Sequence, residues 1–158
     1  MRSSQPRSIC LPTLRDRRTS SGRSAIVVSA VFDASVVVRA GVDRSPAARA
    51  WTARLDRDVS GHAPDLLWAE VASALRRYVQ TGAMARRQAH EVLAYALGLR
   101  LAVRPLRGLA APALDRAMAS DLSVYDAYYV VLADALGATL VTADRALAAA
   151  AGRAELIG

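Results

Sequence analysis

Four acidic residues are the ones whose types and positions could carry chemistry. Asp33 directly follows a mostly apolar run, residues 25–32, that is typical of a buried strand, and Glu70, Asp126 and Asp144 each lie at or near the start of a later expected helix. In a parallel sheet the ends of the strands and the beginnings of the following helices meet at one edge, where ligands bind. We therefore expect the four carboxylates to form one metal site.

Clustered carboxylates have a limited chemical repertoire. They repel one another and raise each other's pKa values unless a cation neutralises them. Hard oxygen ligands favour Mg²⁺ or Mn²⁺, which keep several waters and also bind phosphate oxygens. Such a site activates a water and stabilises the leaving oxygen in the displacement of a phosphodiester.

Each acid also has a structural explanation when it is taken alone. Asp33 and Asp144 stand where a helix N-cap is expected, and Asp126 follows Ser123 at the spacing of a capping box. Glu70 differs, because it lies inside its helix beside the apolar stripe with no opposite charge four residues away. The metal site is thus favoured by the four positions together and not by any one of them.

The elements that must position these acids alternate along the chain. Helices are expected at 34–40, 45–57 (Ser45 as N-cap, Pro46 next), 65–81 (Asp65 as N-cap, Gly82 as end), 84–97, 108–120, 123–136 (Ser123 as N-cap, Gly137 as end) and from Asp144 onward. Strands are expected at 25–32, 99–103, 138–142 and, at a sheet edge, 155–157, with a strand or loop at 60–64. This alternation predicts a single α/β sandwich with a mainly parallel sheet.

Composition limits the class of protein. A chain of 158 residues suits one domain, and its one cysteine, Cys10, excludes an internal disulfide and suits the reducing cytoplasm, with no apolar run long enough to span a bilayer. All 21 Lys+Arg residues are arginine, and the absence of lysine excludes a P-loop NTPase and a response-regulator receiver.

The net charge of +7 is unevenly distributed. Residues 1–24 hold six arginines and one aspartate, a net +5, which leaves only +2 of the total for residues 25–158. We expect residues 1–24 to be a disordered basic tail; a transit peptide, a secretory signal, or a true translation start near Val27 or Val28 are the alternatives. Residues 25–158 are expected to form the folded domain.

Four runs around the acids resemble the four acidic motifs of PIN-domain ribonucleases. These runs are residues 31–38, 66–75, 122–127 and 140–145, and their order and spacing are similar to those of the VapC-type toxins of type II toxin–antitoxin systems. The resemblance implies a three-layer α/β/α sandwich with a five-stranded sheet. It also implies a single-strand endoribonuclease that depends on Mg²⁺ or Mn²⁺, is inhibited by a cognate antitoxin protein and forms a homodimer.

The same resemblance assigns roles to particular residues. It implies that the metal-binding and catalytic acids are Asp33, Glu70, Asp126 and Asp144, and that the hydroxyls of Ser35 and Thr142 position them. The sequence leaves open an alternative in which a PIN-like domain no longer cleaves RNA and serves as an RNA-binding or protein-interaction module. The RNA that would be cut is not encoded in any readable motif.

Other arrangements of chemistry are disfavoured. A dehalogenase-type phosphatase needs a second aspartate two residues after Asp33, where Ser35 stands. His62 and His90 are isolated from one another and from any cysteine cluster, so a histidine–metal site is not expected. The two tryptophans, Trp51 and Trp68, are expected to pack in the core and not to stack on bases.

Overall fold

A computed structural model of the protein describes residues 27–55 and 57–158. The strands are β1 (Val28–Phe32), β2 (Val59–Pro64), β3 (Leu101–Arg104), β4 (Thr139–Thr142) and β5 (Ala154–Leu156). The helices are α1 (Ala34–Gly41), α2 (Pro46–Thr52), α3 (Leu67–Gln80), α4 (Arg86–Leu97), the short 3₁₀ helix η1 (Leu106–Gly108), α5 (Ala110–Met118), α6 (Val124–Leu136) and α7 (Arg145–Ala150). The predicted tail, residues 1–24, lies outside the described residues.

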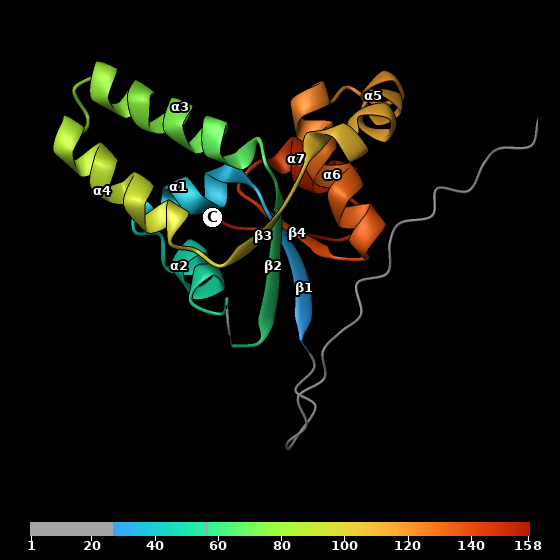
Figure 1. The fold of residues 1–158 in the computed structure, drawn as a ribbon, viewed down its shortest axis with the longest axis horizontal. Coiled ribbons are helices and arrows are strands. Elements are labelled where there is room, and N and C mark those ends of the chain that lie inside the picture. Colours follow the sequence, from blue (N-terminus) through green and yellow to red (C-terminus); the bar gives the residue numbers. More distant parts are fainter. Residues whose placement is uncertain (1–26, 56) are drawn as a thin grey trace, which may run out of the picture.

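All five strands are parallel, in the order β3-β2-β1-β4-β5. Figure 1 shows α1 to α4 on one side of the sheet and α5 to α7 on the other, so the expected three-layer α/β/α sandwich is confirmed. Helices α3 and α4 pack against each other as a pair that extends away from the sheet. Within the described ranges, no helix is long and apolar enough to cross a membrane.

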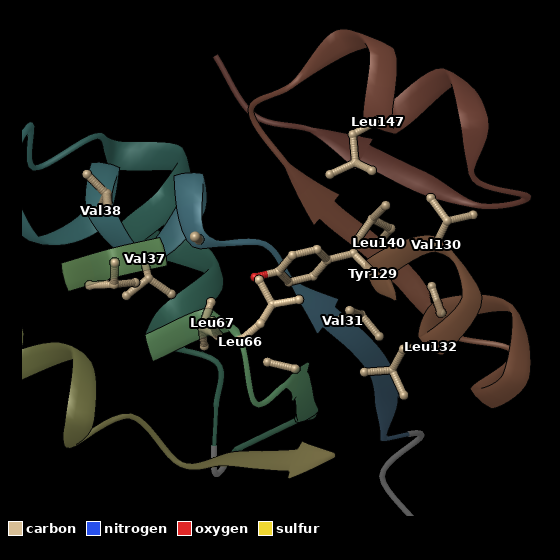
Figure 2. Packing of buried hydrophobic residues seen from close by; sticks show 14 of the residues in the cluster. Val31, Val37, Val38, Leu66, Leu67, Tyr129, Val130, Leu132, Leu140 and Leu147 are labelled. Carbon is tan, nitrogen blue, oxygen red and sulfur yellow. The ribbon is translucent and has the colours of Figure 1, made fainter. Parts of the chain in front are cut away.

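The central strand β1 is buried on both faces, as its apolar sequence predicts. Val31 belongs to a cluster that includes residues of α1, α3 and α6, whereas its neighbour Phe32 packs in a second cluster with Val36 and Val141. Successive side chains of a strand point to opposite faces, so one strand supplies both clusters. Figure 2 shows the first cluster, with Val31 and Leu140 of the sheet beside Tyr129 of α6.

Several predicted helix ends are confirmed. The Ser45 hydroxyl accepts from the Ala48 N–H, and the Ser123 hydroxyl accepts from the Asp126 N–H. Gly137 ends α6 with φ of 58°, a left-handed conformation that glycine adopts without the cost of a Cβ clash. These signals are local, which explains why the sequence reveals them.

Two other helix predictions are wrong. Asp65 does not cap α3, which begins at Leu67 without a side-chain cap; instead the Asp65 N–H donates to the Arg104 carbonyl, tying the turn to β3. Helix α2 ends at Thr52 and not near residue 57, because the chain turns there and Leu55 forms a bridge with Val59 at the start of β2. In both places a contact with a strand overrides the helical signal.

The tryptophans pack as predicted. The ring of Trp51 lies edge-on to Phe32 with the centroids 6.3 Å apart, and Trp68 packs partly buried against the first cluster. The Arg54 guanidinium carbon lies 4.8 Å from the centroid of the Trp51 ring, within the range of a cation–π contact.

Candidate active site

Asp33 lies one residue beyond the end of β1 and is 8% exposed. Its N–H donates to the Val141 carbonyl at 3.1 Å, which extends the β1–β4 pairing to the sheet edge. Its carboxylate oxygen Oδ2 accepts hydrogen bonds from the Ser35 hydroxyl and, at 2.8 Å, from the Thr142 hydroxyl. Burial raises the pKa of Asp33, and these hydroxyl hydrogen bonds oppose that rise by stabilising the ionised form.

The two hydroxyls are themselves held by the backbone of the β4–α7 connection. The Ser35 oxygen accepts from the Ala143 N–H at 2.9 Å, and the Thr142 oxygen accepts from the Asp144 N–H at 3.0 Å. Each hydroxyl therefore accepts from a backbone N–H and donates to Asp33, which fixes the direction of its O–H bond. Ser35 and Thr142, singled out by the motif resemblance, both contact Asp33.

Glu70 reaches the same edge from the first turn of α3 and is half-buried. The Tyr129 hydroxyl of α6 donates to its Oε2 at 2.5 Å, and in Figure 2 this hydroxyl is directed towards the α3 side of the cluster. Burial is the main cause that raises the pKa of Glu70, while the Tyr129 hydrogen bond lowers it and the charges of Asp33 and Asp126 raise it further. Burial and the Glu70 charge also raise the pKa of Tyr129, so the phenol remains a protonated donor.

Asp126 lies in the first turn of α6 and is half-buried. The Ser123 hydroxyl accepts from the Asp126 N–H at 3.1 Å and donates to its Oδ2 at 2.7 Å. The predicted capping spacing is thus correct. In a capping box, however, the acid accepts from the backbone N–H of the N-cap residue, whereas here the Asp126 carboxylate accepts from the Ser123 hydroxyl. One serine both caps the helix and holds the acid.

Asp144 is exposed and behaves as a helix cap. Its Oδ1 accepts from the N–H groups of Ala146 and Leu147, at 2.7 and 3.0 Å, at the beginning of α7. Its charge is not among those that shift the pKa of Glu70. The structure therefore brings Asp33, Glu70 and Asp126 into one electrostatic group, with Asp144 beside it through the Thr142 hydroxyl.

The fit of this edge to a divalent cation can be judged from the donors. As placed, no three His, Cys, Asp or Glu side chains in the described part of the chain are close enough together to hold a metal ion. The donors nevertheless suit Mg²⁺ or Mn²⁺ in kind, since all are carboxylate oxygens. The mutual repulsion that raises the pKa of Glu70 is what a cation between Glu70, Asp33 and Asp126 would relieve.

A cleft of about 920 Å³ opens beside the acids, between α1 and α3. It is lined at one end by Ser35, Glu70 and Tyr125, and elsewhere by the arginines Arg39, Arg76 and Arg77 together with one further carboxylate, that of Asp43. Apolar side chains, Val38, Leu66, Ala74 and Tyr78 among them, form the rest of its wall. The cleft thus combines an acidic end, a basic side and an apolar surface.

Sequence reasoning missed Tyr129 and the three arginines of the cleft. Tyr129 follows Asp126 by three residues, a spacing that puts both on one face of a helix, so the pattern could have indicated it. No sequence pattern indicated the three arginines. All 21 Lys+Arg residues of the chain are arginine, so the choice of arginine does not mark any single position. Only the packing of α1 against α3 brings them to one cleft.

Comparison with known proteins agrees with this geometry. Residues 30–153 match the family model of the PIN domain. Ribonuclease VapC1 of Mycobacterium tuberculosis is 35% identical over 125 residues, which are 77% of this chain and 90% of that protein. Ribonuclease VapC9 of the same species is 37% identical over 83 residues, 52% of this chain, and the match spans only 64% of its length.

Solved structures show the same fold. PAE2754 from Pyrobaculum aerophilum superposes with a TM-score of 0.61 at 25% identity, over 82% of this chain and 90% of that one. A toxin–antitoxin complex from Klebsiella pneumoniae gives a TM-score of 0.56 at 15% identity, over 80% and 95%. With the family model covering most of the folded body and a relative matched over nine-tenths of its length, the chain belongs to the PIN domain family.

Proposed function

We propose that this protein is a VapC-type endoribonuclease that cleaves single-stranded RNA with Mg²⁺ or Mn²⁺. The observation that carries the proposal is the electrostatic group of Asp33, Glu70 and Asp126 at the carboxyl edge of the sheet, next to a cleft lined by arginines. The relatives named as ribonucleases support the same activity. RNA is in the cytoplasm, the compartment that the single cysteine favours.

The proposed metal ligands are the carboxylates of Asp33, Glu70 and Asp126, with Asp144 as a fourth acid from the next loop. When bound, the cation would activate a water and stabilise the leaving oxygen of the phosphodiester. Asp144 would contribute through Oδ2, since Oδ1 is engaged in capping α7. The four acids would hold the cation. They would not bind the RNA strand directly, because carboxylates repel phosphates.

The remaining residues of the site orient and bind. Ser35 and Thr142 hold the Asp33 carboxylate through Oδ2, and Tyr129 holds Glu70, so that these acids do not have to be ordered when substrate binds. Arg39, Arg76 and Arg77 would bind phosphates of the RNA strand along the cleft. Single-stranded substrate suits this cleft because backbone phosphates can follow it without a paired strand.

A cleavage assay with purified protein tests the proposal. We expect cleavage of single-stranded RNA with Mg²⁺ or Mn²⁺, none with EDTA, and much slower cleavage of a duplex of the same sequence. Asp126→Asn should reduce the rate by about 100-fold or more, about 2.7 kcal/mol of lost transition-state stabilisation. Asp134→Asn, on the same helix but in an ion pair with Arg116, is the matched control and should cleave normally.

Two outcomes would contradict the proposal, one for the metal mechanism and one for cleavage itself. Undiminished cleavage in EDTA, or by Asp33→Asn and Asp126→Asn alike, would exclude the metal mechanism. A folded wild-type protein that binds RNA but never cuts it would instead support the silent binding module.

We also propose that a cognate antitoxin inhibits the enzyme by placing a short amphipathic helix in this cleft. The apolar wall would supply most of the affinity, and a basic side chain of the antitoxin would extend to Asp33, Glu70 and Asp126. Raising the Mg²⁺ concentration should then weaken inhibition, because the cation and the basic group compete for the same carboxylates. Full inhibition by an antitoxin peptide stripped of basic residues would contradict the competition.

A homodimer is the third part of the proposal. Three exposed apolar side chains lie on α5 and at the first residue of α6, two helices that pack against each other: Leu114, Met118 and Val124. A second copy covering this surface would remove them from water. Light scattering on the wild type and on Met118→Glu should show a dimer and a monomer respectively; a monomeric wild type would disprove this part alone.

A further inference from the structure

Arg104, the last residue of β3, is a half-buried cation without a counter-ion. Its Nε is enclosed in the protein and has no hydrogen-bond partner. No carboxylate of the described ranges forms an ion pair with Arg104, in contrast to the pairs Arg54–Asp58, Arg87–Glu91 and Arg116–Asp134. The enclosed Nε is out of reach of a ligand, but no hydrogen bond or ion pair within the described ranges engages the Nη groups of this half-buried guanidinium, which can therefore donate to an external anion.

The strand register places Arg104 in the same row as Asp33. Arg104 is paired with Pro64 of β2, and Val31 with His62, so extending β1 by two residues puts Asp33 level with Pro64. Neighbouring strands are about 4.8 Å apart, so two strand spacings put the Cα atoms of Arg104 and Asp33 roughly 10 Å apart. Residues in one row of a parallel sheet point to the same face, and Arg104 therefore shares the face of Asp33.

His62, which is close enough for the Arg104 charge to lower its pKa, does not neutralise Arg104. His62 lies two residues before Pro64 on β2, is 9% exposed, and its Nδ1 is also buried without a partner, while Nε2 is 3.2 Å from the Ser60 hydroxyl. Burial and the Arg104 charge lower the pKa of His62, which keeps the imidazole neutral. The positive charge of Arg104 thus remains uncompensated at the carboxyl edge of the sheet.

We propose that Arg104 binds a phosphate of the RNA strand on the β3 side of the acids, as a positioning residue for the substrate. This inference rests on the proposed ribonuclease function. The guanidinium offers paired donors that match a phosphate, and a partly desolvated site strengthens that contact. The strand would then be held on one side of the acids by the arginines of the α1–α3 cleft and on the other side by Arg104, which would fix the scissile bond between them.

The test compares Arg104→Gln and Arg104→Lys with Arg87→Gln, an exposed arginine of α4 whose partner is Glu91. The probe is a single-stranded RNA of mixed sequence carrying a fluorophore and a quencher. For Arg104→Gln we expect KM to rise about tenfold with kcat changed less than about threefold, and the slope of log affinity against log salt to fall by about 0.7, the loss of one phosphate contact. Arg104→Lys should restore the salt slope and part of the KM, and Arg87→Gln should match the wild type.

Thermal unfolding provides an arm that needs no RNA. Removing an unpaired cation should leave the melting temperature of Arg104→Gln equal or higher, and inorganic tripolyphosphate should stabilise the wild type and Arg87→Gln more than Arg104→Gln. If wild type neither binds nor cuts RNA but shows this tripolyphosphate effect, the ribonuclease proposal fails and the anion site stands. If wild type cuts RNA while Arg104→Gln keeps the KM and salt slope of Arg87→Gln, the inference is overturned.

Discussion

At the scale of single residues, the ionised forms of two acids at the sheet edge, Asp33 and Glu70, are destabilised in the metal-free protein. The pKa values of Asp33 and Glu70 are both raised, chiefly by burial, although three hydroxyls donate hydrogen bonds to the two carboxylates. The cost of these ionised groups is tolerable for a site that is completed by a cation.

The first prediction concerns the pH dependence of stability. A group whose pKa is higher in the folded than in the unfolded state stabilises the protein at low pH, and this contribution is lost as the pH rises through the folded-state value. We therefore expect the melting temperature of the metal-free protein to gain a contribution from these two acids as the pH falls from neutral towards the ordinary carboxyl pKa, about 4. Asp33→Asn and Glu70→Gln should each reduce this contribution.

Calorimetry with EDTA measures the effect. In the presence of Mg²⁺ this contribution should shrink, since the cation stabilises the ionised acids. An unchanged pH dependence of the melting temperature in both variants would contradict the assignment of the raised pKa values to Asp33 and Glu70.

The second prediction isolates Tyr129. In Tyr129→Phe the hydroxyl that donates to Glu70 is gone, so the pKa of Glu70 should rise further and the acid limb of the pH–rate profile should move to higher pH. The free energy of unfolding should fall by about 1 kcal/mol at neutral pH. Tyr128→Phe is the control on the adjacent position of α6, and an unmoved acid limb in Tyr129→Phe would show that the phenol does not act through Glu70.

At the scale of elements, helix N-termini are used both to begin helices and to hold acids. Ser123 caps α6 and bonds the Asp126 carboxylate, and Asp144 caps α7 while its N–H donates to Thr142. Cap and site are therefore coupled: a change that frays the first turn of α6 or α7 also moves an acid. The strand ends contribute through the same edge, with Thr142 of β4 bonded to Asp33.

The third prediction tests that coupling. Ser123→Ala should lower the free energy of unfolding by about 1 kcal/mol through the lost cap, and should also slow RNA cleavage because Asp126 loses the hydroxyl that orients it. Ser123→Thr should recover both quantities. Ser120→Ala, which removes a hydrogen bond to the Arg116 carbonyl outside the site, is the control for urea unfolding and cleavage rates. Normal cleavage by a destabilised Ser123→Ala would separate the cap from the catalysis.

At the scale of the whole molecule, the acidic edge is built on a sheet with a hydrophobic core on both of its faces, as far as the structure describes the chain. The two hydrophobic clusters take their members from β1 to the C-terminal Ile157, and β1 itself begins at Val28. All four proposed metal-binding acids lie after this point. Residues 1–24 carry most of the net charge of the chain, but they contain none of these four acids.

The fourth prediction follows from that division. Deleting residues 1–24 should leave the melting temperature within a few degrees of the full chain, and the rate of RNA cleavage at physiological salt within about twofold, because the two hydrophobic clusters of the described residues and all four proposed acids are kept. RNA affinity at low salt should fall, since a net charge of +5 is lost. An unfolded truncated protein, or loss of cleavage at both salt concentrations, would show that the segment is required for the fold or the site.

The sequence by itself determined the features of local structure that depend only on residues adjacent in the chain, namely the strands, the helix caps and the turns. The buried strand before Asp33, the caps at Ser45, Ser123 and Asp144, and the left-handed glycine at 137 each follow from a few consecutive residues, and the alternation of such segments predicts a parallel α/β sandwich. Three of the acids, Asp33, Asp126 and Asp144, could be expected at one sheet edge because they stand at the beginnings of helices, whereas Glu70 was expected inside its helix beside the apolar stripe.

Only the tertiary structure decided which groups meet across that edge. The bond from Tyr129 to Glu70 joins positions 59 apart, and that from Thr142 to Asp33 joins positions 109 apart. Arg104 shares a row with Asp33 only through two strand pairings. Side-chain direction at such distances depends on how whole helices and strands pack, because each element is fixed by many weak contacts at once, and no local spacing encodes that sum.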